Sequence, residues 1–202
     1  MTSTLTTARP RTLQWRVVDI VVASVIAVAC ALIFLAWIPL SAGPSTLLKP
    51  LLPGLQGLLN GPWLIAGPLA GLIVRKPGAA VYAEFVAAAL ELLVLPAYGA
   101  GVLVSGLIQG LGAELVFAVF LYRSFGPIVA LLSGAVAGVA ETAFDIPVWY
   151  AGTTAAFWVV YGITTVVSGA VIGLICSPLV RAIAATGVLD RFASGRTARR
   201  LV

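Results

Sequence analysis

Apolar residues in this chain fall into six runs, separated by short segments rich in proline, glycine and charged residues. A hydrocarbon core about 30 Å thick requires roughly 20 helical residues to cross it. Clusters of proline and glycine mark the turns between helices. The six runs are Val17–Ile38, Leu51–Val74, Ala79–Leu95, Ala100–Tyr122, Ile128–Phe144 and Ala155–Val180. This pattern predicts an all-α integral membrane protein with six transmembrane helices.

The second run is the one most interrupted by proline, with Pro53, Pro62 and Pro68 inside it. Proline removes a backbone donor and kinks or ends a helix. Inside a membrane, such a break is tolerated where the freed backbone packs in protein or lines a cavity. We therefore expect this span to be broken or kinked near its outer end.

Basic residues gather at alternate ends of the six runs, which predicts the orientation of the chain. Cytoplasmic loops of membrane proteins carry an excess of Lys and Arg. With six spans every basic residue except Lys49 falls on one side, whereas five or seven spans would scatter them. These residues are Arg9, Arg11, Arg16, Arg75, Lys76, Arg123, Arg181, Arg191, Arg196, Arg199 and Arg200. We expect that side, and both termini, to be cytoplasmic.

The same pattern divides the chain into three parts. Residues 1–14 are a polar cytoplasmic segment, residues 15–182 the six-helix membrane domain, and residues 183–202 a basic cytoplasmic tail. The first apolar run is about 22 residues long, which exceeds the h-region of a signal peptide. We expect it to be retained as the first span.

Composition agrees with a membrane protein, since 61% of residues are hydrophobic and 9% are charged. In soluble domains about 45–50% of residues are hydrophobic and about 25% are charged. The chain has a net charge of +5, but its basic residues lie at the ends of the predicted spans, so nucleic acid is not an expected partner. The chain has no His and no CxxC, so no metal or other cofactor is expected. Cys30 and Cys176 lie in apolar runs and are expected to be small buried hydrophobes.

Enzyme motifs are missing from the sequence. It contains no GxxxxGK[ST], GxSxG or HExxH, which are the signatures of a P-loop, a nucleophile elbow and a zinc protease. No catalytic residues are expected, and any ATP hydrolysis would reside in separate partner proteins.

Four glutamates stand inside the predicted spans, where a charge costs a few kcal/mol at least and usually marks a site or pathway. Counting about 1.5 Å of rise per residue from the basic ends gives their depths. Glu84 and Glu114 fall about 12–13 Å from that side, near the bilayer centre. A second set falls at roughly 21–24 Å: Asn60, Glu91, Gln109, Glu141 and Thr165. We predict a polar substrate-binding layer in the outer half of the membrane.

Structural roles remain open for some acidic residues. A buried Glu can serve only to hydrogen-bond neighbouring helices, and Glu114 is the strongest candidate for that role. Asp19 lies three residues from Arg16 at the membrane face and is expected to form an ion pair with it.

Aromatic residues gather near the predicted layer. Trp37 and Tyr98 fit an interfacial aromatic belt. Trp63, Trp149, Trp158 and Tyr161 are instead candidate substrate-binding residues beside the carboxylates. Aromatic faces combined with carboxylates suit a flat, nitrogen-rich or cationic ligand.

Small residues recur at helical spacing and permit close approach of helices. The first span carries Ala23, Ala27 and Ala31 at every fourth position. Glycine pairs four residues apart occur at Gly67/Gly71, Gly106/Gly110, Gly134/Gly138 and Gly169/Gly173. We expect these glycines to pack inside the bundle rather than to form a dimer interface.

Three motifs resemble a known family: PGLQGLLNGPWL (Pro53–Leu64), RKPGAAVYAEFVAA (Arg75–Ala88) and SGLIQGLGAELVFA (Ser105–Ala118). Together they resemble the YkoE-type substrate-binding (S) components of energy-coupling factor (ECF) transporters, from about Trp15 to Arg181. The resemblance implies a vitamin-capture subunit in a bacterial cell membrane. Its implied partners are a transmembrane coupling (T) subunit and two ATPase subunits or domains. Its implied ligand is thiamin or the hydroxymethylpyrimidine precursor.

The resemblance also implies roles for individual residues. Within the matched motifs it implies that Glu84, Gln109 and Glu114 belong to the site, while Glu91, Glu141 and Thr165 rest on the depth count alone. It implies that the alanine stripe (Ala23, Ala27 and Ala31) docks on the coupling subunit. Ser41–Lys49 is then a candidate gating loop for substrate entering from outside. Which carboxylate meets which ligand atom stays open.

Two other functions remain compatible with the residues. One is a stand-alone, ion-coupled carrier for a small cationic or heteroaromatic solute, although no internal repeat supports it. The other is a non-transport membrane assembly factor in which the carboxylates only join helices.

Overall fold

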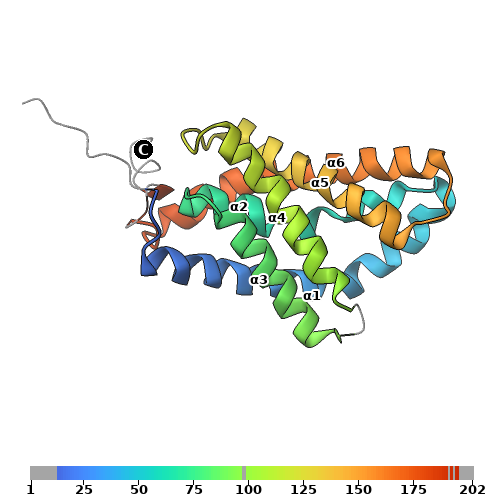
Figure 1. The fold of residues 1–202 in the computed structure, drawn as a ribbon, viewed down its shortest axis with the longest axis horizontal. Helices are drawn as coiled ribbons and strands as arrows, with labels where there is room; N and C mark the ends of the chain where they lie inside the picture. Colours follow the sequence, from blue (N-terminus) through green and yellow to red (C-terminus); the bar gives the residue numbers. More distant parts are fainter. Residues whose placement is uncertain (1–12, 97–98, 191, 193, 196–202) are drawn as a thin grey trace, which may run out of the picture.

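The computed structural model describes residues 13–96, 99–190, 192 and 194–195, and within them all the regular secondary structure is helical (Figure 1). The elements are α1 (Val17–Leu51), the 3-10 helices η1 (Leu55–Leu59) and η2 (Gly61–Leu64), α2 (Ala66–Val74), α3 (Ala79–Val94), α4 (Gly101–Val119), α5 (Pro127–Trp149) and α6 (Ala155–Ala185). Seven residues considered above lie outside the described part: Arg9, Arg11, Tyr98, Arg191, Arg196, Arg199 and Arg200. The expectation of an all-α membrane protein with six helices is confirmed.

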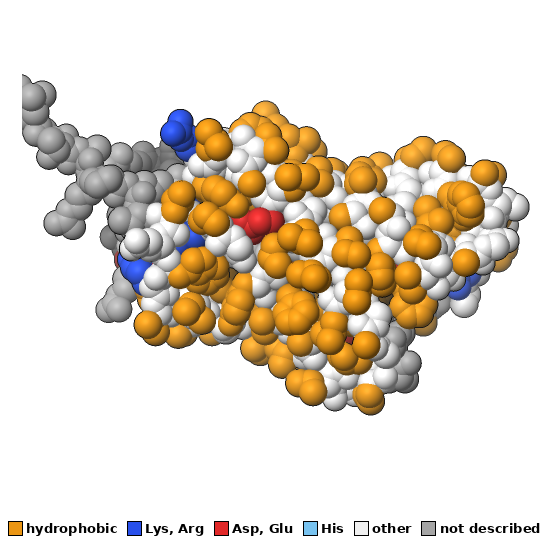
Figure 2. Space-filling view, in the orientation of Figure 1, with side chains coloured by type: hydrophobic (Ala, Val, Ile, Leu, Met, Phe, Trp, Pro, Cys, Tyr) orange, Lys and Arg blue, Asp and Glu red, His pale blue; other side chains and the backbone are white. Residues whose placement is uncertain are grey.

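Four of the helices, α1, α4, α5 and α6, are long and apolar enough to cross a membrane by themselves. The other two predicted spans are shorter: α3 has 16 residues, and the second span is an apolar helical stretch over Gly61–Val74. Hydrophobic side chains cover the middle of the molecule, and basic side chains gather toward one end of it (Figure 2). This distribution is the one expected for a protein whose midsection faces lipid.

Helix α1 is longer than the sequence predicts. The prolines were expected to end it at Ile38, yet it continues through Pro39, Pro44 and Pro50 to Leu51. Ser41–Lys49 is therefore helical, and the prediction of a gating loop there is wrong. A proline removes one hydrogen bond and can kink a helix without ending it. The second half of α1 accordingly departs from the line of its first half (Figure 1).

The second span is broken between α1 and α2, as predicted, and its freed backbone groups are satisfied by side chains of α6 and α1. Thr164 Oγ1 donates to the carbonyl of Gly54 at 3.0 Å. Ser168 Oγ donates to the carbonyl of Leu58 at 2.7 Å and accepts from the amide of Gly61 at 2.8 Å. Trp37 Nε1 donates to the carbonyl of Leu59 at 2.8 Å. The irregular backbone is thus buried in protein, as a membrane interior requires.

Glycine allows this segment to lie directly on α6. A Cβ added at Gly57 would fall 2.5 Å from Thr164 Oγ1, and one added at Gly61 would fall 2.6 Å from Ser168 Oγ. Any side chain at these two positions would push the segment off the hydroxyl groups that satisfy it.

The glycine pairs of the long helices pack inside the bundle, as expected. A Cβ at Gly134 of α5 would lie 2.0 Å from the carbonyl oxygen of Gly169 on α6. A Cβ at Gly110 of α4 would lie 2.8 Å from the Cα of Val81 on α3. Cys30 and Cys176 are buried and unbonded to one another, which confirms their assignment as small core residues.

The alanine stripe of α1 lies inside the fold. Ala23, Ala27 and Ala31 are 0%, 0% and 3% exposed and belong to the hydrophobic core. The surface of α1 that faces away from the bundle is formed by larger side chains, such as Val25 and Leu32. The stripe therefore joins α1 to its own neighbours, and docking of a partner on it would require α1 to separate from them.

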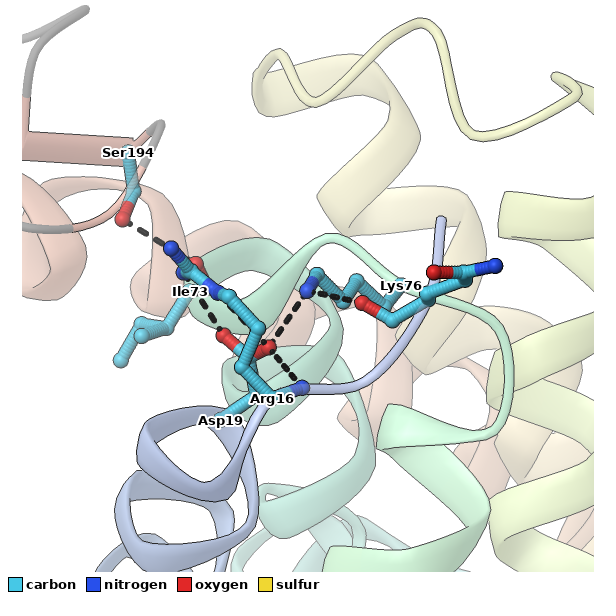
Figure 3. A network of polar contacts seen from close by, with 6 residues as sticks. Arg16, Asp19, Ile73, Lys76 and Ser194 are labelled. Carbon is cyan, nitrogen blue, oxygen red and sulfur yellow. Dashed lines mark hydrogen bonds and ion pairs between the residues drawn. The ribbon is translucent and has the colours of Figure 1, made fainter. Parts of the chain in front are cut away.

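An ion cluster closes the basic end of the bundle (Figure 3). Asp19 of α1 accepts from Arg16 Nη2 at 3.0 Å and also pairs with Lys76. Lys76 in turn donates to the carbonyl of Gln14. The predicted pair between Arg16 and Asp19 is confirmed, and Lys76 extends it so that the start of α1 is joined to the turn between α2 and α3.

Replacing Ser168 by alanine should lower the stability of the fold by about 1–2 kcal/mol. The substitution leaves the carbonyl of Leu58 and the amide of Gly61 without their buried partner. Thermal unfolding in a fixed detergent measures the change. Thr46→Ala is the matched control, since its exposed hydroxyl bonds only to its own helix. Equal unfolding temperatures for the two variants would contradict the role given to Ser168.

Candidate functional site

A cavity of about 400 Å³ lies in the half of the bundle remote from the basic end. Every α-helix contributes to it except α2, and its polar side chains come from α3, α4, α5, α6 and the segment that contains η1 and η2. Its lining consists of Phe34, Ile38, Asn60, Trp63, Glu84, Ala88, Glu91, Val102, Ser105, Gly106, Gln109, Glu141, Asp145, Trp149, Tyr150 and Tyr161. A cavity of this size with a few convergent polar groups is typical of a small-molecule site.

Glu84 is the most constrained of the polar groups in the cavity wall. Its Oε2 accepts from the amide of Gly67 at 2.6 Å, which ties α3 to the start of α2. Gly106 and Gly110 of α4 lie against its backbone and Cβ, so its position on α3 is fixed on both sides. The side chain is 1% exposed, and among the described residues its Oε1 has no hydrogen-bond partner. A buried carboxylate oxygen in this state is an acceptor available to a ligand.

Two carboxylates of α5, Glu141 and Asp145, lie one turn apart and both line the cavity. Ser105 of α4 donates to the Glu141 carboxylate at 2.9 and 3.1 Å, and Gln109 Nε2 donates to Ser105 Oγ at 2.7 Å. This chain of hydrogen bonds fixes the rotamers of all three side chains.

A second chain of hydrogen bonds reaches the α5 carboxylates from the opposite side. Asn60 Nδ2 donates to the hydroxyl of Tyr161 at 2.7 Å, and that hydroxyl donates to Asp145. Asn60 also donates to Thr165 Oγ1 at 3.1 Å. The broken second span therefore orients α6 and α5 side chains at the cavity wall.

Aromatic rings form the remaining wall. Tyr150, at the turn after α5, packs against Phe157 and Tyr161 of α6 with centroid distances of 4.9 and 4.8 Å. Trp63 of η2, Glu91 of α3 and Trp149 at the end of α5 line the cavity as well. The cavity thus combines negative charge with aromatic faces, a combination that suits a flat cation or a nitrogen heterocycle. No group of three or more His, Cys, Asp or Glu that could hold a metal ion occurs in the described part of the chain.

The structure brings eight of the sequence-predicted site residues together around this cavity: Asn60, Trp63, Glu84, Glu91, Gln109, Glu141, Trp149 and Tyr161. Thr165 is fully buried behind the cavity wall, and its hydroxyl accepts a hydrogen bond from Asn60 Nδ2. Trp158 lies apart from the cavity; its side chain is 39% exposed and donates to Thr153.

Glu114 also lies apart from the cavity. Its carboxylate accepts from the amides of Gly78 and Ala80 at 2.8 and 2.9 Å and from the hydroxyl of Tyr122 at 2.7 Å. Burial, the hydrogen bond to Glu114 and that carboxylate's charge raise the pKa of Tyr122, so its hydroxyl stays a donor. Glu114 thereby caps the start of α3. The depth count placed it level with Glu84 because it assumed helical rise from Arg123, whereas α4 ends at Val119 and residues 120–123 form a turn.

Several lining residues were not among the predicted site residues. Ser105 and Asp145 each lie one turn from a predicted residue, Gln109 and Glu141, on the same helix face. The i, i+4 spacing of these pairs was the signal that could have found them. Phe34 and Tyr150 carried no comparable signal, because an aromatic in an apolar run is most often a core or interface residue.

Comparison with known proteins places the whole membrane domain among transporter components. Residues 18–140 match the family described as "ABC-type cobalt transport system, permease component". The "Putative HMP/thiamine permease protein YkoE" of Bacillus subtilis (strain 168) is 31% identical over 194 residues, covering 93% of this chain and 94% of that protein. The solved structure described as "Crystal structure of an S-component of ECF transporter" is 30% identical, with a TM-score of 0.84, and the match covers 93% of this chain and 94% of that one.

Glu114→Gln and Glu84→Gln should affect stability in different ways. An amide at position 114 has one acceptor oxygen for three donors, so Glu114→Gln should destabilise the fold by about 1.5–3 kcal/mol. An amide at position 84 can still accept from Gly67 and removes a buried charge, so Glu84→Gln should be neutral or stabilising. Thermal unfolding of both variants in one detergent gives the comparison. A loss at position 84 as large as that at position 114 would contradict the separation of roles.

Proposed function

This chain belongs to the substrate-binding (S) components of ECF transporters, and from that premise we propose that it captures thiamin or its hydroxymethylpyrimidine precursor in the cavity described above. An S component is a multi-pass membrane subunit of a transporter rather than an enzyme, and it works with an energy-coupling module. The observation that carries the choice of substrate is the buried, unpartnered Oε1 of Glu84 in the cavity wall. The printed name of the Bacillus subtilis relative supports the same two compounds.

An aminopyrimidine is complementary to Glu84. Its ring nitrogen and the adjacent exocyclic amine point in the same direction, so they can form two parallel hydrogen bonds with a carboxyl group. Oε1 accepts from the amine, and the proton between Oε2 and the ring nitrogen can reside on either partner. Oε2 keeps its bond to Gly67, because each carboxylate oxygen can accept more than one hydrogen bond.

The α5 carboxylates supply the second half of the site for thiamin. Glu141 and Asp145 place negative charge on one wall, with Trp149 and Tyr150 beside them. A thiazolium ring carries a permanent positive charge and stacks on aromatic faces. Hydroxymethylpyrimidine lacks this ring, so it would use the contact with Glu84 and leave the α5 carboxylates unengaged.

The direction of capture follows from charge. Arg16, Arg75, Lys76, Arg123 and Arg181 all lie at the ends of helices opposite the cavity. With that end in the cytoplasm, both termini are cytoplasmic and the cavity lies in the outer half of a bacterial cell membrane. Thiamin or its precursor would enter from outside. Release inward would depend on a transmembrane coupling subunit and two ATPase subunits or domains.

Glu84→Leu should lower the affinity of the purified chain for both compounds by roughly 30- to 1000-fold, which is about 2–4 kcal/mol. Leucine removes the paired contact entirely. Glu84→Gln should lose less, because an amide can still pair with an unprotonated ring nitrogen. Calorimetric titration with thiamin and with hydroxymethylpyrimidine measures both. Asp190→Asn, which removes an exposed carboxylate that does not line the cavity, is the control. Wild-type affinity in a folded Glu84→Leu protein would refute the assignment of the site.

Asp145→Asn should separate the two substrates. The amide can still accept from Tyr161, so the wall keeps its shape while losing one negative charge. Thiamin affinity should fall about tenfold, as expected for one nearby charge in a partly shielded site. Affinity for hydroxymethylpyrimidine should stay within about twofold of the wild type. An equal loss for both compounds would show that the α5 carboxylates do not recognise the thiazolium ring.

A further inference from the structure

A second cavity of about 400 Å³ lies at the basic end of the bundle and has a different chemistry. Three arginines from three elements line it: Arg75 at the end of α2, Arg123 between α4 and α5, and Arg181 near the end of α6. The hydroxyl-bearing residues Ser124, Ser177 and Ser194 line it as well. No Asp or Glu is among the described residues of this lining. The cavity is therefore strongly positive and offers hydroxyl donors in addition to guanidinium groups.

Two features direct this positive charge into the cavity. The Arg75 guanidinium lies over the ring of Phe125 at 4.8 Å from the ring centroid, which holds it at the wall. Helix α5 begins at the same wall with Gly126 and Pro127, and within the described chain no side chain caps this terminus. The N-terminus of a 23-residue helix carries partial positive charge and favours anions.

The basic cavity continues into an apolar groove on the outside of the bundle. The groove has a volume of about 320 Å³ and is lined by Pro127, Leu174, Ile175, Ser177, Pro178 and Arg181. Three of these residues, Pro127, Ser177 and Arg181, also line the basic cavity, so the two spaces adjoin. Leu174 and Ile175 are 44% and 47% exposed on a helix that crosses the membrane. The basic cavity and the apolar groove thus meet at Arg181.

We propose that this composite site binds an anionic phospholipid, with the phosphate in the Arg75, Arg123 and Arg181 cavity and an acyl chain in the groove at Leu174 and Ile175. Arginine forms paired hydrogen bonds with phosphate oxygens. The site lies at the end of the bundle that faces the anionic leaflet, where basic pockets between helices bind lipid headgroups. A soluble phosphate compound would satisfy the arginines and leave the groove empty, so the groove favours lipid.

Bound lipid would join the α2–α3 turn, the α4–α5 turn and the end of α6 at the membrane surface. These three elements carry the arginines and are separated in sequence by 48 to 106 residues, from Arg75 to Arg123 and to Arg181. A phosphate group between them offsets the repulsion of three like charges. The site is separate from the substrate cavity, with which it shares no lining residue.

Native mass spectrometry of the full chain tests the proposal, after equilibration with phosphatidylglycerol and phosphatidylcholine of identical acyl chains. The wild type should retain phosphatidylglycerol in preference to phosphatidylcholine. Arg181→Gln should weaken this retention roughly fivefold, and the Arg123→Gln/Arg181→Gln double variant roughly 25-fold, at about 1 kcal/mol for each basic residue near the surface. Lys49→Gln, which removes a basic residue at the opposite end of the bundle, should bind as the wild type does.

A soluble probe, glycerol 1-phosphate, distinguishes the two sources of phosphate. Ile175→Trp, which fills the exposed groove, should weaken retention of phosphatidylglycerol and leave the binding of glycerol 1-phosphate unchanged. Equal retention of the two lipids by the wild type overturns the proposal without any substitution. Equal loss in Arg181→Gln and Lys49→Gln also overturns it. If glycerol 1-phosphate binds as tightly as the lipid and Ile175→Trp has no effect, a soluble anion is the ligand and the lipid assignment is wrong.

Discussion

Polar groups inside a membrane must find their hydrogen bonds within the protein, and the arrangement of this bundle follows from that constraint. Asp19 is paired with Arg16 and Lys76, and Glu114 accepts from two backbone amides and a tyrosine. The broken second span is satisfied by hydroxyl groups of α6. Several of these interactions, such as Lys76 with Asp19 and Glu114 with the amides of Gly78 and Ala80, join elements distant in sequence. These polar groups therefore connect helices that lipid alone would not drive together.

Glu84 is an exception, because its Oε1 has no hydrogen-bond partner among the described residues. This side chain lines the cavity. The helix that carries it is fixed by glycines of α4 on one side and by Gly67 on the other, so the carboxylate cannot turn away to find a partner. A fold that holds an unsatisfied acceptor in place gives up stability, and natural sites commonly do so where a ligand supplies the missing bond. The same oxygen thus has no partner within the described part of the chain and would make a contact in the proposed complex.

Two cavities of similar volume at opposite ends of the bundle have opposite charge. The cavity remote from the basic end combines carboxylates with aromatic rings and suits a cationic heterocycle. The cavity at the basic end combines arginines with hydroxyl groups and suits a phosphate. They share no lining residue, although α5 and α6 contribute to both. The distribution of charge therefore matches both the proposed direction of capture and the polarity of the membrane itself.

The sequence by itself determined the class of protein, the broken second span, the basic end and most of the polar residues in the cavity remote from that end. These follow from periodicity, length and local charge, which depend only on neighbours along the chain. Only the tertiary structure decided that Glu114 caps α3, that Ala27 is buried, and that Ser41–Lys49 is helical. A residue count gives distance along a helix axis, but it contains no information on helix tilt or on which neighbour covers a face. Those depend on the packing of helices that meet from distant parts of the chain.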